Sequence, residues 1–309
     1  MKRLVLFTLC LCLLWGCAAV PSPTEAEGYR FTDDLGRTVT VRNPQRVASL
    51  LGSFADVWIL AGGSLCAAAE DAWEDFGLEL EDAVNLGGAH SPSLELLLSA
   101  APDFVLASAS TASNLEMRET LEAAGIAVAY FDVDNFEDYL HMLDICTDIT
   151  GRKDLYLQNG TQLQTQIRAI KEQYAQEDIP REQRTVLLLR AASGFVKAKG
   201  STGTILGEML ADLGCINIAD SDSSLLENLS VEAVIRAQPY HIFVVTMGSN
   251  TEAAKACLYS MLEENPAWGS LDAIREGRMY IMDKALFNLK PNERWAEAYQ
   301  KLYETLTRS

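Results

Sequence analysis

Several patterns that would point to an enzyme or a metalloprotein are missing from this sequence. It contains three histidines and seven cysteines, and no two cysteines have the C-x-x-C spacing of a zinc or redox site. No G-x-S-x-G, H-E-x-x-H, G-x-G-x-x-G or P-loop pattern occurs, so the usual signatures of hydrolases, metalloproteases, dinucleotide-binding proteins and ATPases are absent. We therefore expect no enzymatic activity, no intrinsic cofactor and no metal site.

Basic residues are also scarce. The 309-residue chain has 25 lysines and arginines against 43 aspartates and glutamates, which gives a net charge of −18. Binding to nucleic acid requires clustered lysine and arginine side chains, so we expect no nucleic-acid partner. Hydrophobic residues make up 49% of the chain, enough for well-formed cores. The length allows two domains of about 150 residues each.

The N-terminus has the pattern of an export signal. Lys2 and Arg3 precede an apolar run from Leu4 to Trp15, which is shorter than the roughly 20 residues that a membrane-spanning helix needs. The run leads into Gly16-Cys17 and resembles a bacterial lipoprotein signal, in which the cysteine is lipidated and becomes the first mature residue. We predict a signal peptide over residues 1–16 and a lipid anchor on Cys17. The alternative is an ordinary secretory signal with an incidental cysteine.

Small and polar residues follow the predicted anchor. Residues 17–28 have the composition of a flexible tether, so the lipid is the expected contact with the membrane. An exported chain can form disulfide bonds, but we favour buried free thiols for the remaining cysteines. These are Cys66, Cys146, Cys215 and Cys257.

Apolar strands alternate with helices along most of the chain, at the spacing of right-handed parallel crossovers. The alternation stops after Phe136, where no strand is predicted before the end of a helix over about 152–176, roughly 37 Å long. Such a helix is long enough to lie across two lobes. We predict an α/β fold of two Rossmann-like lobes with central, mostly parallel sheets, residues 29–150 and 179–309, joined by one long backbone helix at 151–178.

A helix, a proline and an apolar strand occur twice, in Ser91–Ala107 and in Asn228–Val244. We expect the first residue of each segment to cap its helix and each proline to end it. Both copies keep a glutamate at the start of the helix. The matched positions are Ser93/Ser230, Glu95/Glu232, Ala100/Ala237 and Pro102/Pro239.

The chain contains, in this order, the segments DDLGRTVTV, QRVASLLGS, SLELLLSAAPDFVLA, LEAAGIAVAYFD, SVEAVIRAQP and NPAWGSLDAIREGRMYIMD. Together they resemble the helical-backbone class of ABC-transporter substrate-binding proteins, the branch that handles iron-siderophores, haem and cobalamin. The resemblance spans residues 29–306. It implies a monomeric, extracytoplasmic protein that captures an iron chelate, haem or corrinoid between its lobes and delivers it to a permease dimer with separate ATPase subunits.

The resemblance also gives the repeated glutamates a role. In that family one surface glutamate on each lobe docks onto arginines of the permease, and these positions correspond to Glu95 and Glu232. Two carboxylates on separate lobes would set orientation and association rate. The alternative is that each glutamate only compensates the dipole of its helix.

Ligand-binding residues are expected beyond the carboxyl ends of the strands. There, a serine at a helix N-terminus suits an anionic oxygen. Arg190, next to a buried apolar stretch, requires an anionic partner, either a ligand or an internal salt bridge. The predicted ligand-binding residues are Ser53, Phe54, His90, Ser108, Arg190, Met247 and Phe287.

Four of these residues have more specific roles in the prediction. Phe54 and Phe287 are expected to pack against a flat or greasy ligand. His90 or Met247 is a candidate ligand to a haem iron, although a loop histidine can also serve only in hydrogen bonds. Three scattered histidines argue against a zinc or manganese carrier.

Two other classes of function remain open at the level of sequence. A ligand sensor for a membrane receptor would share the fold and the cleft. An exported hydrolase would need a scattered Ser/His/Asp triad, to which no pattern points. The sequence does not choose among siderophore, haem and cobalamin, nor between periplasm and cell surface.

Overall fold

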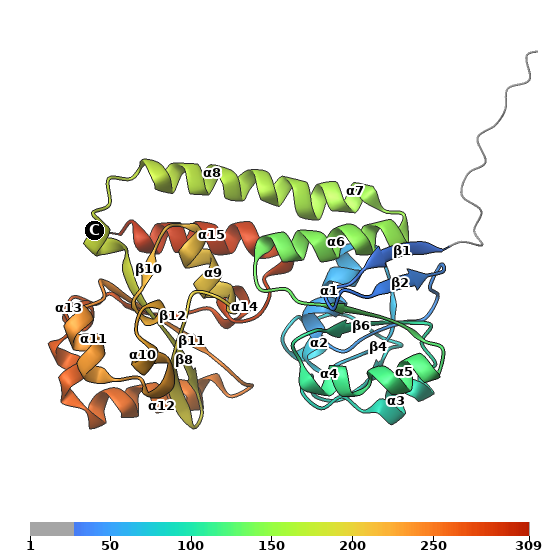
Figure 1. Cartoon of the computed structure of the whole chain (residues 1–309), viewed down its shortest axis with the longest axis horizontal. Helices are drawn as coiled ribbons and strands as arrows, with labels where there is room; N and C mark the ends of the chain where they lie inside the picture. The colour runs from blue at the N-terminus through green and yellow to red at the C-terminus, as the bar shows by residue number, and fades with distance from the viewer. Residues whose placement is uncertain (1–27, 309) are drawn as a thin grey trace, which may run out of the picture.

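The computed structural model describes residues 28–308 and contains two α/β lobes beneath one long helix (Figure 1). The predicted signal peptide, the lipidation site Cys17 and nearly all of the tether lie outside the described residues. Among these residues, no helix is both long and apolar enough to cross a membrane. The predicted α/β class with two mostly parallel sheets is confirmed, while the exact lobe boundaries stay a prediction.

The N-terminal lobe is built on a five-stranded parallel sheet with the strand order β5-β4-β3-β6-β7. An antiparallel hairpin of β1 (Tyr29–Thr32) and β2 (Thr38–Val41) lies beside it. Every residue of β6, which lies between β3 and β7, is buried, and its apolar character fits this position. The sheet strands are β3 (Val47–Ser49), β4 (Leu65–Ala68), β5 (Val84–Asn85), β6 (Phe104–Ser108) and β7 (Ala127–Phe131).

The C-terminal lobe repeats this plan with the order β10-β8-β11-β12. These four strands are parallel, and one further strand pairs antiparallel with β8. The strands are β8 (Thr185–Ala192), β9 (Phe195–Lys199), β10 (Ile216–Asn217), β11 (His241–Thr246) and β12 (Met279–Met282).

Helices cover the faces of both sheets. Those of the N-terminal lobe are α1 (Gly52–Leu60), α2 (Asp71–Glu74), α3 (Leu94–Ser99), α4 (Ala112–Glu116), α5 (Arg118–Ala123) and α6 (Phe136–Thr150). Those of the C-terminal lobe are η2 (Arg181–Arg184), α9 (Ile205–Asp212), η3 (Ile218–Asp220), α10 (Ser223–Asn228), α11 (Val231–Ala237), α12 (Thr251–Glu264), η4 (Pro266–Ser270), α13 (Asp272–Arg275), α14 (Lys284–Phe287), η5 (Asn292–Arg294) and α15 (Trp295–Leu306).

The connection between the lobes is helical from Lys153 to Gln176, close to the predicted 152–176. It comprises α7 (Lys153–Tyr156), a π-helical turn η1 (Leu157–Thr161) and α8 (Gln162–Gln176). It runs along one side of the molecule above both lobes (Figure 1). At the π-helical turn the carbonyl of Asn159 accepts a hydrogen bond from the Tyr139 hydroxyl at 2.8 Å, so the widened turn is anchored to α6.

One apolar core continues beneath this helix from lobe to lobe. It includes Phe131 of the first sheet, Leu188 of the second, and Ile167 and Ile170 on the inner face of α8. Each buried isoleucine contributes about 1.5–3 kcal/mol through the hydrophobic effect. Trp295 of α15 belongs to the same core and is fully buried. The lobes are therefore held by shared packing as well as by the chain connection.

The repeated segments form equivalent helices, but the predicted caps at Ser91 and Asn228 are wrong. The side chains of Ser93 and Ser230 accept the capping hydrogen bonds instead, from the backbone N–H groups of Leu96 and Ala233. A helix needs its cap directly before the first turn, and the helices begin two residues later than the apolar pattern suggested. Cys66, Cys146, Cys215 and Cys257 are free thiols, as predicted, but only Cys146 is buried and the other three are partly exposed.

A buried carboxyl group links the N-terminal lobe to the last part of the chain. Asn292 of η5 donates hydrogen bonds from Nδ2 to Oδ2 of Asp56 at 2.6 Å and to the carbonyl of Ser53 at 3.0 Å. Burial raises the pKa of Asp56 to about 7; nearby Glu293 acts in the same direction and the Asn292 hydrogen bond opposes it. The folded protein therefore holds the Asp56 proton more tightly than the unfolded chain does.

Replacing Asp56 by asparagine should stabilise the protein progressively as pH rises. In the wild type, the contribution of the protonated Asp56 is fully present below about pH 4 and is lost as pH rises through about 7. The difference in unfolding free energy between Asp56→Asn and wild type should therefore grow by at least roughly 1 kcal/mol across this interval and stay constant above it. Urea titrations at several pH values measure it.

Asp82→Asn, at an exposed position, is the matched control and should show no such growth. A pH-independent difference for Asp56→Asn would contradict the assignment.

Candidate functional site

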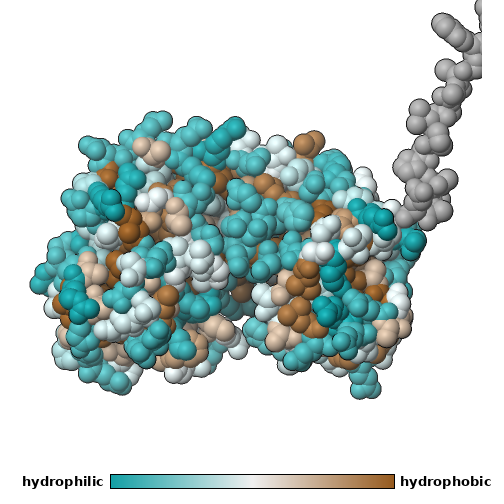
Figure 2. Space-filling view, in the orientation of Figure 1, coloured by the Kyte–Doolittle hydropathy of each residue, from teal (hydrophilic) through white to brown (hydrophobic). Residues whose placement is uncertain are grey.

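A cavity of about 510 Å³ lies between the two lobes, at the edges where the parallel strands end. In the space-filling view the surface is hollowed between the lobes (Figure 2). Its walls follow the carboxyl ends of β3, β4 and β6 on one side and of β8, β11 and β12 on the other. This is the position that the topology of open α/β sheets favours for a ligand.

Five of the predicted binding residues line this cleft. Ser53, His90 and Ser108 come from the N-terminal lobe, and Arg190 and Met247 come from the C-terminal lobe. Ser53 lies inside the first turn of α1 and does not cap it, because the N-cap position is Leu51. The structure thus brings together residues that are up to 194 positions apart in the chain, from Ser53 to Met247.

The two predicted aromatic contacts were wrong. Phe54 is 1% exposed and its ring packs edge-on against Phe131 inside the core. Phe287 is 2% exposed and belongs to the same core. Both rings follow the helical periodicity of their elements and turn inward, where burial of a large ring is most favourable. Neither side chain lines the cleft.

Ser108 acts within the protein rather than as a free hydroxyl. Its Oγ accepts hydrogen bonds from the backbone N–H groups of Ser110 at 3.2 Å and Thr111 at 3.1 Å. The side chain of Asn114 accepts the N–H of Ser108 at 2.9 Å. These contacts fix the loop after β6, so Ser110 and Thr111 are held at the cleft surface.

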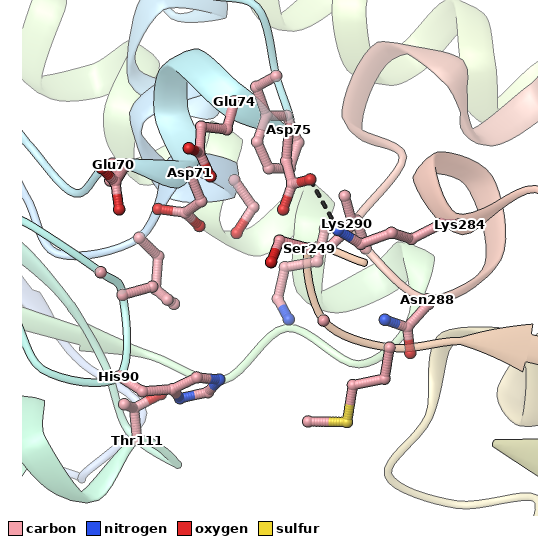
Figure 3. Close-up of a pocket in the computed structure, with 18 of the residues that line it drawn as sticks. Glu70, Asp71, Glu74, Asp75, His90, Thr111, Ser249, Lys284, Asn288 and Lys290 are labelled. Atoms are coloured by element: carbon pink, nitrogen blue, oxygen red, sulfur yellow. Dashed lines mark hydrogen bonds and ion pairs between the residues drawn. The ribbon is translucent and has the colours of Figure 1, made fainter. Parts of the chain in front are cut away.

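The N-terminal wall of the cleft carries four carboxylates. They belong to Glu70, Asp71, Glu74 and Asp75, on and around α2, and Figure 3 shows them gathered on one side of the cavity. A Cβ on Gly52 would lie 2.5 Å from the backbone nitrogen of Ala72, so only glycine allows α2 to approach α1 this closely. Burial raises the pKa of Asp71, and the backbone N–H of Gly52 opposes this shift.

The C-terminal wall carries the cations Arg190, Lys284 and Lys290. Arg190 points from β8, and its buried Nε has no hydrogen-bond partner. Burial lowers the pKa of both Arg190 and Lys290, and Asp134 opposes the shift in each case. Within the described part of the chain, neither side chain forms a hydrogen bond or an ion pair, so the predicted alternative of an internal salt bridge for Arg190 is not found.

One ion pair crosses the cleft among the described residues. The Nζ atom of Lys284 lies 2.7 Å from Oδ1 of Asp75, as the dashed line in Figure 3 marks. The pair joins α14 to the end of α2, and both side chains are partly buried. Together with the contacts of Asn292 described above, it ties the two walls at one side of the cavity.

The site does not have the features of a metal centre. No group of three or more His, Cys, Asp or Glu side chains converges to hold an ion in the part of the chain that the structure covers. His90 is exposed at the cleft surface, and Met247 is 36% exposed on the opposite wall. His241 is buried in β11, where burial, with a smaller effect of Arg278, lowers its pKa to about 4.

Several cleft residues escaped sequence reasoning. The acidic run Glu70–Asp75 follows directly after strand β4, and that position was the signal that could have identified it. Lys284 follows strand β12 in the same way, so the same signal applied to it. Lys290 had no comparable signal, because the chain returns to the cleft there only after α14 and a short loop. Asn288, Ser249 and Thr111 complete the polar lining shown in Figure 3.

The repeated glutamates lie apart from the cleft residues. Glu95 and Glu232 are exposed, in the first turns of α3 and α11. Figure 1 shows both helices on the side of the lobes away from α8. The Ser230 hydroxyl donates to Glu232 Oε2 at 3.2 Å, and the capping serines place both carboxylates at helix N-termini.

The family model for periplasmic binding proteins matches residues 47–286, which contain both sheets and nearly the whole cleft. The chain belongs to this family. Two relatives from Bacillus subtilis (strain 168) are similar over most of their length. The putative ABC transporter substrate-binding lipoprotein YhfQ is 21% identical, over 94% of this chain and 93% of the relative. The Fe(3+)-citrate-binding protein YfmC is 23% identical, over 91% of this chain and 88% of the relative.

A solved structure shares the fold of this periplasmic binding protein. Staphylococcus aureus SirA, complexed with staphyloferrin B, superposes with a TM-score of 0.71 and 18% sequence identity, over 90% of this chain and 98% of SirA. The likeness establishes the two-lobe arrangement with a connecting helix. The predicted membership of a binding-protein family is confirmed by the family model, and the fold agrees with the predicted two lobes joined by one helix.

Removing the cross-cleft ion pair should loosen α2 without unfolding the protein. Lys284→Met is expected to lower the unfolding free energy by less than about 1 kcal/mol, because the pair is partly exposed. Amide hydrogen exchange of residues 70–77 should become faster. Lys255→Met, which breaks the ion pair with Glu252 inside α12, is the matched control. Unchanged exchange in Lys284→Met would show that the pair does not hold the walls together.

Proposed function

We propose that this protein captures a ferric chelate in the cleft through Arg190 and Lys290 and delivers it to an ABC importer. The observation that carries the proposal is a pair of cations on one wall of the cavity, Arg190 and Lys290, that form no ion pair with any of the described residues. Burying a cation without a partner is unfavourable, and an anionic or oxygen-rich ligand would compensate both groups at once. Arginine is suited to this because its planar guanidinium can donate two parallel hydrogen bonds.

Ligand chemistry supports iron as the cargo. A ferric chelate binds its iron through carboxylate, hydroxamate or catecholate oxygens. Such oxygens, where they reach the surface of the chelate, can accept hydrogen bonds from Arg190 and Lys290. The relative YfmC is a Fe(3+)-citrate-binding protein, and SirA was crystallised with staphyloferrin B. Ser53 and the loop at Ser110 and Thr111 add hydrogen-bonding groups on the opposite wall.

The expected place of action is the outer face of the cell membrane. The predicted signal peptide at 1–16 and the predicted lipidation of Cys17 would anchor the chain there, with residues 17–28 as tether. The relative YhfQ is a putative substrate-binding lipoprotein, which supports this localisation. The proposed partners are a permease dimer and its ATPase subunits, and the protein would meet them as a monomer.

Docking would use Glu95 and Glu232. Both carboxylates are exposed at helix N-termini on different lobes, and the two-point charge match would orient the loaded protein on basic residues of the permease. The same arrangement would serve a sensor that reports to a membrane receptor, so uptake has to be measured directly.

Haem is the second candidate cargo, and one observation favours it. His90 and Met247 line the same cavity from opposite lobes, and an imidazole and a thioether can both coordinate a haem iron. Against it, both large aromatic rings that were expected to contact a flat ligand lie in the core. Among the described residues that line this cavity, Phe76 is the only phenylalanine, tyrosine or tryptophan.

Binding of a ferric chelate should depend on Arg190. Arg190→Met is expected to weaken binding of ferric citrate or a ferric hydroxamate at least about tenfold, because a charge-assisted hydrogen bond contributes about 1.5–3 kcal/mol. Isothermal titration measures the affinity. Arg168→Met, on the exposed face of α8, is the control. If Arg190→Met bound the ferric chelate as tightly as the wild type does, Arg190 would not be a binding residue. If the wild type bound haem tightly and His90→Ala did not, the second candidate cargo would be favoured.

Delivery should depend on both repeated glutamates. In cells, the double variant Glu95→Ala/Glu232→Ala is expected to lower uptake of the bound ferric chelate at least about tenfold, because close charge pairs at an interface couple by about 1.5–7 kcal/mol. Its affinity for the chelate should not change. Glu116→Ala/Glu263→Ala removes two exposed carboxylates elsewhere on the lobes and serves as the matched control. Normal uptake in cells with Glu95→Ala/Glu232→Ala would contradict docking through these glutamates, and the role as a ligand sensor would remain as the alternative.

A further inference from the structure

We infer that the cargo is a ferric chelate with a protonated amine, and that Glu70 and Glu74 on the wall opposite Arg190 and Lys290 bind this amine. The inference rests on the proposed function and narrows its ligand class. A chelate of this kind presents oxygen atoms to one wall and a single ammonium group to the other.

The acidic wall has charge that the protein itself does not neutralise. Asp75 is paired with Lys284 across the cleft. Asp71 has a buried Oδ1 without a hydrogen-bond partner. The carboxylates of Glu70 and Glu74 form neither a hydrogen bond nor an ion pair within residues 28–308, although both line the cavity. Two free carboxylates flank the α2 turn and face the space that a ligand would fill (Figure 3).

A second observation, independent of the acidic cluster, shows that this space is built for a charged ligand. Lys290 and Arg190 lie on the opposite wall of the same cavity, both are partly buried, and neither forms a hydrogen bond or an ion pair within residues 28–308. The cleft therefore has two poles of opposite sign. A purely anionic chelate would satisfy the basic pole and be repelled by the acidic one, whereas a chelate with an added ammonium group satisfies both.

The acidic wall is better suited to an organic cation than to a metal ion. A cation such as Ca²⁺ takes six to eight oxygen ligands that converge on one point. The carboxylates here are spread along α2, and no converging group of three potential ligands occurs among the described residues. An ammonium group requires only one or two acceptors, which the spacing of Glu70 and Glu74 on one helical face supplies.

A pair of probes that differ only in the amine tests the inference. Ferrioxamine B is a ferric trihydroxamate with one free primary amine, and its N-acetyl derivative lacks that charge but keeps the iron core. The wild-type protein should bind ferrioxamine B at least about tenfold more tightly, in line with a charge-assisted hydrogen bond. Ferric citrate, which has no amine, is titrated alongside.

The double variant Glu70→Gln/Glu74→Gln should lose the preference for ferrioxamine B and keep its affinity for the N-acetyl form. Glu79→Gln/Glu81→Gln is the matched control, because it removes two exposed carboxylates of the same segment outside the cavity lining and should keep the preference. Thermal unfolding of each variant verifies that the fold is intact.

The results separate the inference from the function on which it rests. Equal binding of the two hydroxamates by the wild type, or a preference that survives in Glu70→Gln/Glu74→Gln, would overturn the amine contact. Tighter binding of ferric citrate than of either hydroxamate would overturn it as well, while leaving ferric-chelate capture intact. Binding of none of the three ferric chelates would instead overturn the proposed function.

Discussion

The structure depends on the apolar core that continues beneath the connecting helix. Ile167 and Ile170 of α8 belong to one apolar cluster with residues of both sheets, and α8 packs along α15 at the C-terminal end of the chain. Separating the lobes widely would expose these side chains to water, at about 25 cal/mol for each Å² of apolar surface. The shared core therefore opposes a wide separation of the two walls of the cleft.

Charged side chains of opposite sign lie on the two walls of the cleft. Arg190 and Lys290 form no ion pair with Glu70 or Glu74 among the described residues, so opposite charges stay separated on the two walls of the cavity. Lys284 and Asp75 are the exception, since α14 brings them within 2.7 Å. Under the proposed function, a ligand of complementary polarity would compensate the remaining charges. Preorganised charges of this kind favour specificity, because a ligand of the wrong sign leaves them uncompensated.

Much of this could be predicted from the sequence, and the failures have local causes. The alternation of strands and helices predicted the two sheets, and the uninterrupted helical stretch predicted the connection between them. Arg190 was predicted to face the cleft because a guanidinium next to a buried strand is unusual, and it does line the cavity. Phe54 and Phe287 were misplaced because a residue near a strand end can point into the cleft or into the core, and helical phase decides which. The caps were misplaced by two residues for a different reason, because the boundaries of helices and strands are the part of a fold that a sequence pattern defines least well.

The sequence by itself determined the elements of the fold and the duplicated plan, because apolar periodicity and turn residues act over short distances along the chain. Only the tertiary structure decided the chemistry of the cleft. Glu70 and Lys290 are remote in sequence and face the same cavity solely because two sheets end at a common edge. Charge complementarity between such residues is a property of their positions in space, and no local pattern in the chain encodes it.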